Sequence, residues 1–203
     1  MSEFDNKAQD WDKNLLHIQR SEAIAKALLK IVPLHKGMKA LEYGSGTALL
    51  SFLLKDEFDE ITLMDNSREM TQVAKDKIAN ENAKNMKPLL FDLEKEDFKS
   101  KFDIIYTQMV LHHIGDIDAI FNKFLALLNT GGYLAIADLY PEDGSFHGNG
   151  FVGHRGFDVE IIANKLHNIG FKNIQHQQCH LLKKEDETGN IRSYPIFLLT
   201  ASI

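Results

Sequence analysis

The strongest constraint on the fold is an alternation of short apolar runs with longer segments of helical period. Runs rich in Ile, Leu, Tyr and Phe are expected to be strands, at residues 38–43, 60–64, 86–91, 102–107 and 132–138. Several segments between them place apolar side chains every three or four positions, which is typical of amphipathic helices. Strands that alternate with helices predict crossover connections and a parallel sheet with helices on both faces.

Local signals also predict where helices begin and end. Asn66, with Glu69 three residues later, resembles a capping box and predicts a helix start. The apolar pattern over residues 117–128 predicts another helix, which ends at Gly131 in a left-handed cap. A further helix is expected to begin with Asp158 as its N-cap.

The C-terminal part of the chain breaks this alternation. Residues 171–182 and 193–203 are strand-like and lie too close together for a crossover helix, so they should pair as an antiparallel hairpin. The predicted fold is therefore α/β, with a seven-stranded sheet of five parallel strands plus a C-terminal antiparallel hairpin. Without internal repeats or linkers, residues 1–203 are expected to form a single domain. Residues 36–203 should form the core of this domain. Residues 1–35 should form helices that cap its functional site.

Composition and charge exclude several classes of protein. The net charge is −6, whereas nucleic-acid binding needs clustered Lys and Arg, so we expect no nucleic-acid partner. The apolar stretches are too short to span a membrane, and the polar N-terminus is neither a signal peptide nor a transit peptide. Cys179 is the single cysteine, which excludes an internal disulfide. These features predict a cytoplasmic protein with no membrane association.

The stretch ALEYGSGTALLS, residues 40–51, places two glycines around one small residue directly after an apolar run. A P-loop is excluded because Gly46 is followed by TALLS rather than by Lys and then Ser or Thr. The dinucleotide fingerprint requires a glycine where Leu49 stands, which weakens a nicotinamide interpretation without excluding it.

Two carboxylates near these glycines favour a different ligand. Glu42 precedes Gly44 by two residues, where it would repel a pyrophosphate and attract a cationic group. Asp65 follows Gly44 by 21 residues, at the end of the second predicted strand, where a carboxylate can bind ribose hydroxyls. S-adenosylmethionine has a ribose and a positive centre but no phosphates, and therefore fits this pattern.

Taken together, these motifs resemble those of class I S-adenosylmethionine-dependent methyltransferases, in the small-molecule branch near the quinone-biosynthesis methyltransferases. LEYGSGTALLS is similar to their glycine-rich segment, MDNSREM to their ribose-binding turn and FDLEKEDF to their adenine-contacting segment. The resemblance implies a Rossmann-like fold and the transfer of a methyl group from S-adenosylmethionine to a small organic acceptor. Ala48 departs from the pattern, since many relatives have a glycine there, and we expect a slightly tighter helix start.

The resemblance also implies roles for individual residues. The glycine-rich turn would lie against the methionine part of the cofactor, with Glu42 near its ammonium group. Asp65 would bind the ribose, and Asp92 the adenine amino group. The implied cofactor-binding residues are Glu42, Gly44, Ser45, Gly46, Asp65, Asn66, Met70, Asp92, Leu93 and Gln108.

Histidines near the predicted site are the candidate catalytic groups. Methyl transfer from a sulfonium mainly needs alignment, and a base is required only where the acceptor keeps its proton at neutral pH. His113 follows the fourth predicted strand, whereas His147 and His154 lie in residues 142–156, a glycine-rich segment expected to be a loose flap over the acceptor. His147 is favoured because it is nearer the strand end. A metal site made of His147, His154 and Asp143 is a weaker hypothesis, so no metal is predicted.

Two alternatives to a methyltransferase stay open at this point. One is a non-catalytic module that binds S-adenosylmethionine, and the other is a nicotinamide-dependent oxidoreductase. Comparing the binding of S-adenosylmethionine with that of NADH, and measuring turnover with an acceptor, would distinguish these alternatives.

Overall fold

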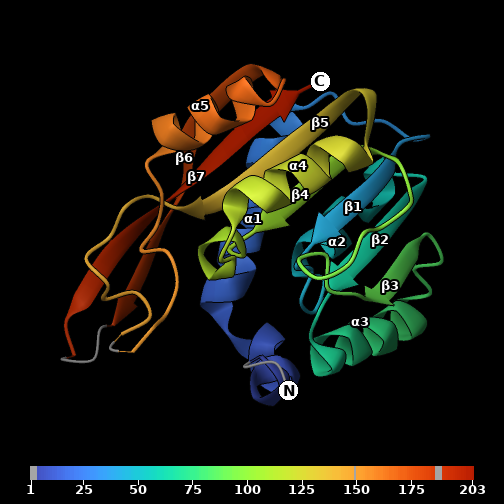
Figure 1. Ribbon diagram of the computed structural model, residues 1–203. Coiled ribbons are helices and arrows are strands. Elements are labelled where there is room, and N and C mark those ends of the chain that lie inside the picture. The colour runs from blue at the N-terminus through green and yellow to red at the C-terminus, as the bar shows by residue number, and fades with distance from the viewer. Residues whose placement is uncertain (1–3, 149, 186–188) are drawn as a thin grey trace.

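The computed structural model describes residues 4–148, 150–185 and 189–203, which form a seven-stranded sheet between two layers of helices (Figure 1). The strands are β1 (Lys39–Tyr43), β2 (Glu60–Asp65), β3 (Met86–Leu90), β4 (Phe102–Gln108), β5 (Leu128–Leu139), β6 (Lys172–Glu185) and β7 (Ile191–Ser202). Their order in the sheet is β3-β2-β1-β4-β5-β7-β6. Strands β1 to β5 are parallel, and β7 pairs antiparallel with both β5 and β6. The predicted parallel sheet with a C-terminal hairpin is confirmed.

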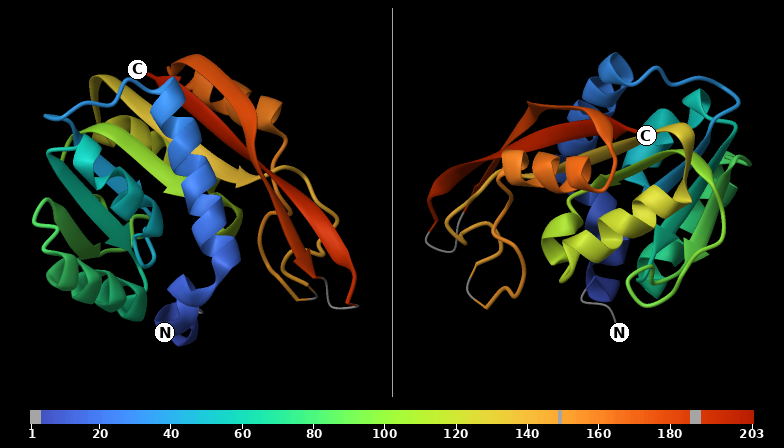
Figure 2. Two further views of the ribbon diagram at one scale, coloured as in Figure 1. Left: turned by 180° about the vertical axis from the view of Figure 1, so that it is seen from behind. Right: turned by 45° about the horizontal axis from the view of Figure 1, so that its top comes forward.

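The helices cover the two faces of this sheet. They are η1 (Asp5–Lys13), α1 (Leu15–Ile31), α2 (Leu49–Leu54), η2 (Lys55–Glu57), α3 (Arg68–Glu81), η3 (Leu111–His113), α4 (Ile117–Leu127) and α5 (Val159–Asn168). Helix α1 lies across the face opposite to α4 and α5 (Figure 2). Among the described residues, no helix combines the length and the apolar composition needed to cross a membrane.

Alternating side chains along each strand build a separate core on each face. In β1, Ala40 belongs to the core formed with α1, α2 and α3, whereas Leu41 belongs to the core formed with α4 and α5. Tyr106 and Ile105 of β4 divide in the same way. This period of two, in strands apolar on both sides, is what a parallel sheet covered by helices requires.

Two of the predicted helix boundaries are wrong. The N-cap of α3 is Ser67, whose hydroxyl accepts a hydrogen bond from the Met70 N–H at 3.2 Å, and Asn66 lies one residue before it. Helix α4 ends at Leu127, and β5 begins at the next residue, so Gly131 does not cap the helix. Gly131 instead has a φ of 79° within β5, close to the point where the β4–β5 register shifts. The predicted N-cap of α5, Asp158, is confirmed.

The N-terminal segment is helical as expected, although its first part is a 3-10 helix. Side chains anchor this helix, η1, beside the start of α3 and the glycine-rich turn. Asp5 accepts a hydrogen bond from the Ser67 hydroxyl at 2.6 Å, and Asp12 accepts from the Lys77 ammonium at 2.6 Å and from the Thr47 hydroxyl at 2.5 Å. The first residues of the chain that the structure describes are thereby held over the carboxyl ends of the strands.

Candidate functional site

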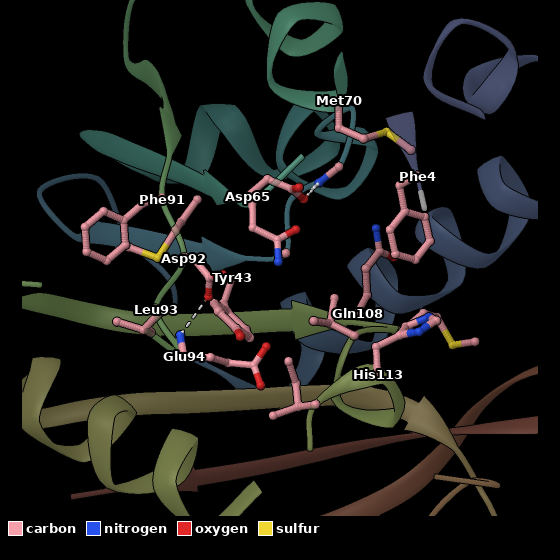
Figure 3. A pocket seen from close by; sticks show the side chains of 17 residues that line it. Phe4, Tyr43, Asp65, Met70, Phe91, Asp92, Leu93, Glu94, Gln108 and His113 are labelled. Atoms are coloured by element: carbon pink, nitrogen blue, oxygen red, sulfur yellow. Dashed lines mark hydrogen bonds between the residues drawn. The ribbon is translucent and has the colours of Figure 1, made fainter. Parts of the chain in front are cut away.

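A pocket opens where the direction of the strand order reverses, between β1 and β4, at the carboxyl ends of the strands (Figure 3). Open α/β sheets bind ligands at this position because the connections from the two strands diverge there. Most of the residues that the sequence assigns to a cofactor line this pocket, namely Gly44, Gly46, Asp65, Asn66, Met70, Asp92, Leu93 and Gln108.

At its first position, the turn after β1 combines a positive φ with no room for a Cβ. Gly44 has a φ of 67°, and a Cβ added there would lie 2.4 Å from Cγ2 of Val110. The turn therefore approaches the segment after β4 closely, and this approach shapes the floor of the pocket. Ala48, at the end of the turn, also has a positive φ, of 65°. The expectation of a tighter helix start thus has a specific form, a left-handed alanine as the N-cap of α2.

Asp65 connects the turn to the end of β2. Its two carboxylate oxygens accept hydrogen bonds from the Gly46 N–H at 2.7 Å and from the Ser67 N–H at 2.8 Å. Burial raises the pKa of Asp65, and these backbone donors partly offset the rise. Each carboxylate oxygen keeps a second lone pair, so the group can bind the turn and a ligand together.

The end of β3 supplies the next part of the wall. Asp92 lines the pocket, with one oxygen accepting from the Glu94 N–H at 3.1 Å and the other paired with the exposed Lys95 at 2.7 Å. Leu93 and Met70 are buried and apolar, which provides surfaces for a flat ring. At the opposite end of the pocket, Gln108 accepts a hydrogen bond from the Ser21 hydroxyl at 3.1 Å.

This first pocket is acidic. The charged residues that line it are Asp65, Asp92 and Glu94, and none of its described lining residues is Lys or Arg. A ligand with phosphates would meet like charge here, whereas a cation would be attracted. The lining therefore fits a nucleoside that carries a positive centre.

Two of the predicted cofactor residues do not line the pocket. Glu42 is fully buried on the α2 side of the sheet, where Oε2 accepts from the Ser51 hydroxyl and Oε1 has no hydrogen-bond partner. Burial raises the pKa of Glu42 to about 8, a rise that the hydrogen bonds from Ser51 limit. Ser45 is also buried, and its N–H donates to the Met64 carbonyl at 3.0 Å. Alternation along β1 explains the position of Glu42, because its neighbour Tyr43 takes the side that faces the pocket.

A second pocket adjoins the first. It lies between η1, α1, the segment after β5 and the outer end of the β6–β7 hairpin. Phe4, Met109 and His113 line both pockets, so the two meet at these side chains. Met109 has a φ of 55°, a conformation that non-glycine residues adopt rarely and that is concentrated at functional sites.

The second pocket is basic, unlike the first. Lys7, Arg20 and Lys184 line it, and Asp10, its one acidic lining residue among those described, is paired with Lys13 at 2.6 Å. Arg20 is 6% exposed, and its Nε has no hydrogen-bond partner. Burial lowers the pKa of Arg20 to about 10, although Asp138 favours its charged form. A buried guanidinium that stays protonated at neutral pH and has an unpaired N–H is suited to bind an anion.

Three histidines stand at the boundary of the two pockets: His112, His113 and His147. Nδ1 of His112 lies 2.6 Å from Oδ1 of the buried Asp138. Burial, together with the neighbouring His112, lowers the pKa of His113 to about 3 and that of His147 to about 4. Both side chains are therefore neutral at pH 7 and keep a lone pair on one ring nitrogen.

His154 lies elsewhere, in a supporting position. Its backbone N–H donates to the His112 carbonyl at 2.8 Å, and its ring Nε2 lies 3.0 Å from the Ile114 carbonyl. His154 therefore stabilises the turn that contains His112. Asp143 is exposed and paired with Arg192 at 2.7 Å. Among the described residues, the metal set of His147, His154 and Asp143 is not assembled, and the three-histidine group takes its place.

The described part of the segment after β5 contacts the β6–β7 hairpin. The Ser145 hydroxyl lies 2.8 Å from the Tyr194 hydroxyl of β7, and the Lys184 ammonium of β6 donates to the Phe146 carbonyl at 2.5 Å. A Cβ added at Gly156 would lie 2.0 Å from the Tyr140 carbonyl oxygen. At Gly156 the glycine permits close packing, and Phe146 and His147 of this segment line the second pocket. The loose flap stays a prediction.

The sequence interpretation missed Arg20, Asp138 and the pairing of Asp138 with His112. A signal for the pair was present, since Asp138 is near the end of the fifth strand and His112 follows the fourth. Adjacent parallel strands bring such positions together at one edge of the sheet. Arg20 gave no comparable signal, because a single arginine in an amphipathic helix is usually exposed.

Comparisons with known proteins agree with this fold. Residues 34–188 match the sequence model of a family described as "methyltransferase domain", and the chain belongs to this family. An uncharacterized methyltransferase of Schizosaccharomyces pombe is 30% identical over 156 residues, which are 68% of this chain and 55% of that protein.

More distant relatives have named substrates. A phosphoethanolamine N-methyltransferase of Triticum aestivum is 28% identical over 161 residues, 73% of this chain and 31% of that protein. The structure of Haemonchus contortus phosphoethanolamine N-methyltransferase 2 in complex with S-adenosyl-L-methionine has the same fold, with a TM-score of 0.70 and 16% identity. That match covers 91% of this chain and 52% of the other. The chain thus spans about half, or less, of the length of these relatives.

Proposed function

We propose that this protein is a methyltransferase that transfers the methyl group of S-adenosylmethionine to a small acceptor with a carboxylate or phosphate group. The observation that carries the proposal is the meeting of an acidic pocket and a basic pocket at Phe4, Met109 and His113. A cationic methyl donor and an anionic acceptor would each occupy the pocket of opposite charge, with their reacting ends at the shared boundary.

The first pocket supports the assignment of the donor. Asp65 and Asp92 offer carboxylate oxygens at the ends of the adjacent strands β2 and β3, as a ribose and an adenine amino group require. The absence of Lys and Arg among its described lining residues disfavours a nicotinamide dinucleotide, whose phosphates need positive partners. When bound, S-adenosylmethionine supplies an electrophilic methyl group on a positively charged sulfur.

The second pocket supports the class of acceptor. The buried Arg20, with Lys7 and Lys184, provides positive charge for one anionic group of a small molecule. The wheat relative is named for phosphoethanolamine, which has such a group. We also propose that nucleic acids are not acceptors, because the chain has a net charge of −6.

The chain's main contribution to catalysis would be alignment. Holding acceptor and donor at the boundary in a reactive orientation contributes roughly 7–11 kcal/mol toward lowering the barrier. For an acceptor that holds its proton at neutral pH, His113 and His147 are the candidate bases, since both rings line the second pocket and are neutral at pH 7. His113 lines both pockets and is therefore nearest to the point of transfer, whereas His154 supports the turn beneath.

We place this activity in the cytoplasm. The support is the single cysteine, which is half-buried and has no cysteine partner, as is usual in a reducing compartment.

The test is to incubate the protein with S-adenosylmethionine labelled in its methyl group and an extract of small metabolites. Mass spectrometry should find the label in a compound that has a carboxylate or phosphate. Arg20→Met should raise the KM for that compound by at least about tenfold, because it removes a charged hydrogen-bond donor. It should leave cofactor affinity unchanged, since Arg20 does not line the first pocket.

Other outcomes would contradict parts of the proposal. Binding of S-adenosylmethionine without transfer to any compound would identify a non-catalytic binding module. Tighter binding of NADH than of S-adenosylmethionine would favour an oxidoreductase. A labelled product without an acidic group would refute the acceptor class and leave the transfer reaction intact.

A further inference from the structure

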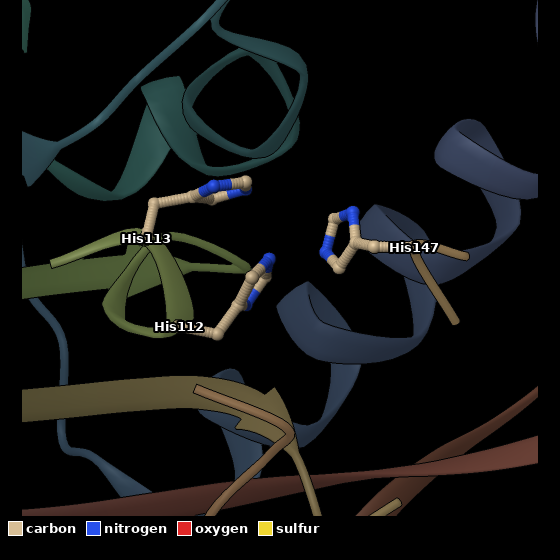
Figure 4. A group of neighbouring side chains, drawn as sticks. All are labelled: His112, His113 and His147. Carbon is tan, nitrogen blue, oxygen red and sulfur yellow. The ribbon is translucent and has the colours of Figure 1, made fainter. Parts of the chain in front are cut away.

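Three histidines at the boundary of the two pockets lie close together, and the proposed reaction does not explain this arrangement. His112 and His113 belong to η3, and His147 comes from the segment after β5, about thirty-five residues further along the chain. One ring nitrogen from each lies within 4.8 Å of the others. The rings are inclined to one another, by 44° for His112 with either neighbour and by 74° for His113 with His147. Their side chains converge on one small volume (Figure 4).

The buried Asp138 fixes the orientation of one of these rings. Its Oδ1 lies 2.6 Å from Nδ1 of His112, and the same carboxylate accepts from the backbone N–H groups of His112 at 3.3 Å and Leu139 at 2.7 Å. A carboxylate oxygen accepts here, so Nδ1 of His112 is the donor, and Nε2 is the nitrogen that faces away from Asp138 and that a metal would take. A carboxylate that holds the far nitrogen of an imidazole in this way is the usual support of a metal-ligating histidine.

The spacing of the nitrogens is compatible with a tetrahedral site after a small adjustment. Zinc–nitrogen bonds of ~2.0–2.1 Å place the ligand nitrogens roughly 3.3–3.4 Å apart. The present separations of at most 4.8 Å therefore require the rings to approach by about 1.5 Å or less, which rotation of His113 and His147 can supply. His112 would stay in place because Asp138 holds it.

We propose that His112, His113 and His147 bind one divalent transition-metal ion, with zinc as the first candidate and Asp138 as the residue that positions His112. Three imidazoles select ions such as Zn²⁺ and Co²⁺, whereas Mg²⁺ and Ca²⁺ prefer oxygen ligands. Three protein ligands leave the fourth position of a tetrahedral ion for another ligand. Because the second pocket adjoins this position, an oxygen or nitrogen of the acceptor would occupy it, an extension that rests on the function proposed above. With the ion bound, the lone pairs of His113 and His147 would be on the metal, so these two rings would not act as bases in that form.

The surroundings of the cluster are also consistent with a metal. The Phe151 ring stacks on His147 with 3.9 Å between ring centroids, and the Phe146 ring lies 4.8 Å from His147 and 6.3 Å from His112. These rings cover part of the cluster, whereas His147 itself is exposed and leaves a path for an ion to enter. The alternative is a purely aromatic cluster that packs the wall of the pocket, and metal titration separates the two.

The test uses untagged full-length protein that has been treated with a chelator and dialysed, with neither S-adenosylmethionine nor acceptor present. Calorimetric titration should show one equivalent of Zn²⁺ bound, and Co²⁺ should give the visible absorption of a four-coordinate site. His147→Ala and His113→Ala should each weaken Zn²⁺ binding by at least tenfold. His35→Ala removes an exposed histidine outside the cluster, and it should match the wild type.

Asp138→Asn tests the positioning role, because it leaves every proposed ligand in place. It should weaken Zn²⁺ binding by about 10–100-fold. Circular dichroism and the unfolding midpoint of each metal-free variant establish that it folds, and His147→Gln provides a second variant of similar size should the alanine variant unfold.

Stoichiometric binding that responds to these substitutions and not to His35→Ala supports the site. Absence of stoichiometric binding, or equal binding by the wild type and His147→Ala, overturns it. Titration of the wild type and of His147→Ala with S-adenosylmethionine is independent of this result, because His147 does not line the first pocket. Failure of the metal site and failure of the proposed methyltransferase function are therefore distinguishable.

Discussion

The buried carboxyl of Glu42 should make the stability of the protein depend strongly on pH. In the unfolded chain this group has its ordinary pKa of 4.5, whereas burial raises the pKa to about 8 in the folded protein. Between these values the folded state holds a proton that the unfolded state has lost. The free energy of unfolding contributed by Glu42 is therefore fully present below pH 4.5 and falls as the pH rises toward 8.

The size of this effect follows from the two pKa values. Within the window the slope is about 1.4 kcal/mol per pH unit, so the contribution of Glu42 should fall by about 2–3 kcal/mol between pH 5 and pH 7. Glu42→Gln is neutral at every pH and keeps an oxygen to accept from Ser51. Its free energy of unfolding should lack this part of the pH dependence.

The assay is urea unfolding of both proteins, without cofactor, at pH 5, 6 and 7. The difference in free energy of unfolding, Glu42→Gln minus wild type, should rise by about 2–3 kcal/mol across the range. Glu22→Gln makes the same chemical change on an exposed side chain of α1 and controls for the loss of one charge. Parallel curves for the wild type and Glu42→Gln would refute the argument that this carboxyl is protonated in the folded protein.

Other predictions concern the turn after β1, the adenine end of the first pocket and the boundary of the two pockets. Gly44→Ala should destabilise the protein by about 2–4 kcal/mol in urea unfolding, since its φ is positive and an added Cβ would collide with Val110. Gly115→Ala is the control and should change stability little, because a Cβ added there would have no atom within 4 Å. Asp92→Ala should weaken S-adenosylmethionine binding and lose discrimination against the inosine analogue in calorimetry, and an unchanged preference would contradict its role at the adenine. With the acceptor known, His147→Ala should lower turnover by roughly 10²–10⁴-fold at constant cofactor affinity. Unchanged turnover would leave alignment alone as the mechanism.

The sheet was predictable because its strands carry local signals. Each strand is a short apolar run, and the sequential pattern of strands and helices allows few topologies. The boundaries were less predictable because neighbouring residues offered equivalent signals. Asn66 and Ser67 are both good N-caps, and the extension of β5 back to Leu128 depends on its pairing with Phe102, which no local pattern encodes.

The residues of the first pocket were largely predictable, and those of the second pocket were not. Asp65 and Asp92 lie at strand ends, and parallel topology alone brings such positions to one edge. Arg20 reaches the second pocket from α1, so its place depends on how a whole helix packs across the sheet. The group formed by His112, His113 and His147 likewise depends on the segment after β5 folding back over η3.

The glycines of the segment after β5 show a different limit of prediction from sequence. Its glycines predict a loose flap, because glycine frees the backbone. In the structure, Gly156 lies against the Tyr140 carbonyl, where any side chain would collide. A glycine can permit either backbone motion or close packing. At Gly156 the close packing depends on the backbone that follows β5, which the local sequence does not show.

Binding of S-adenosylmethionine, compared between the wild type and Asp65→Ala, tests the central claim most directly. Asp65 lines the first pocket, and a buried charged hydrogen bond to a ribose hydroxyl contributes about 1.5–3 kcal/mol. Calorimetry should therefore show one cofactor per chain in the wild type and at least tenfold weaker binding in Asp65→Ala, with circular dichroism confirming that the variant is folded. Absence of binding by the wild type, or equal affinity in a folded Asp65→Ala variant, would contradict the assignment of this pocket to the methyl donor.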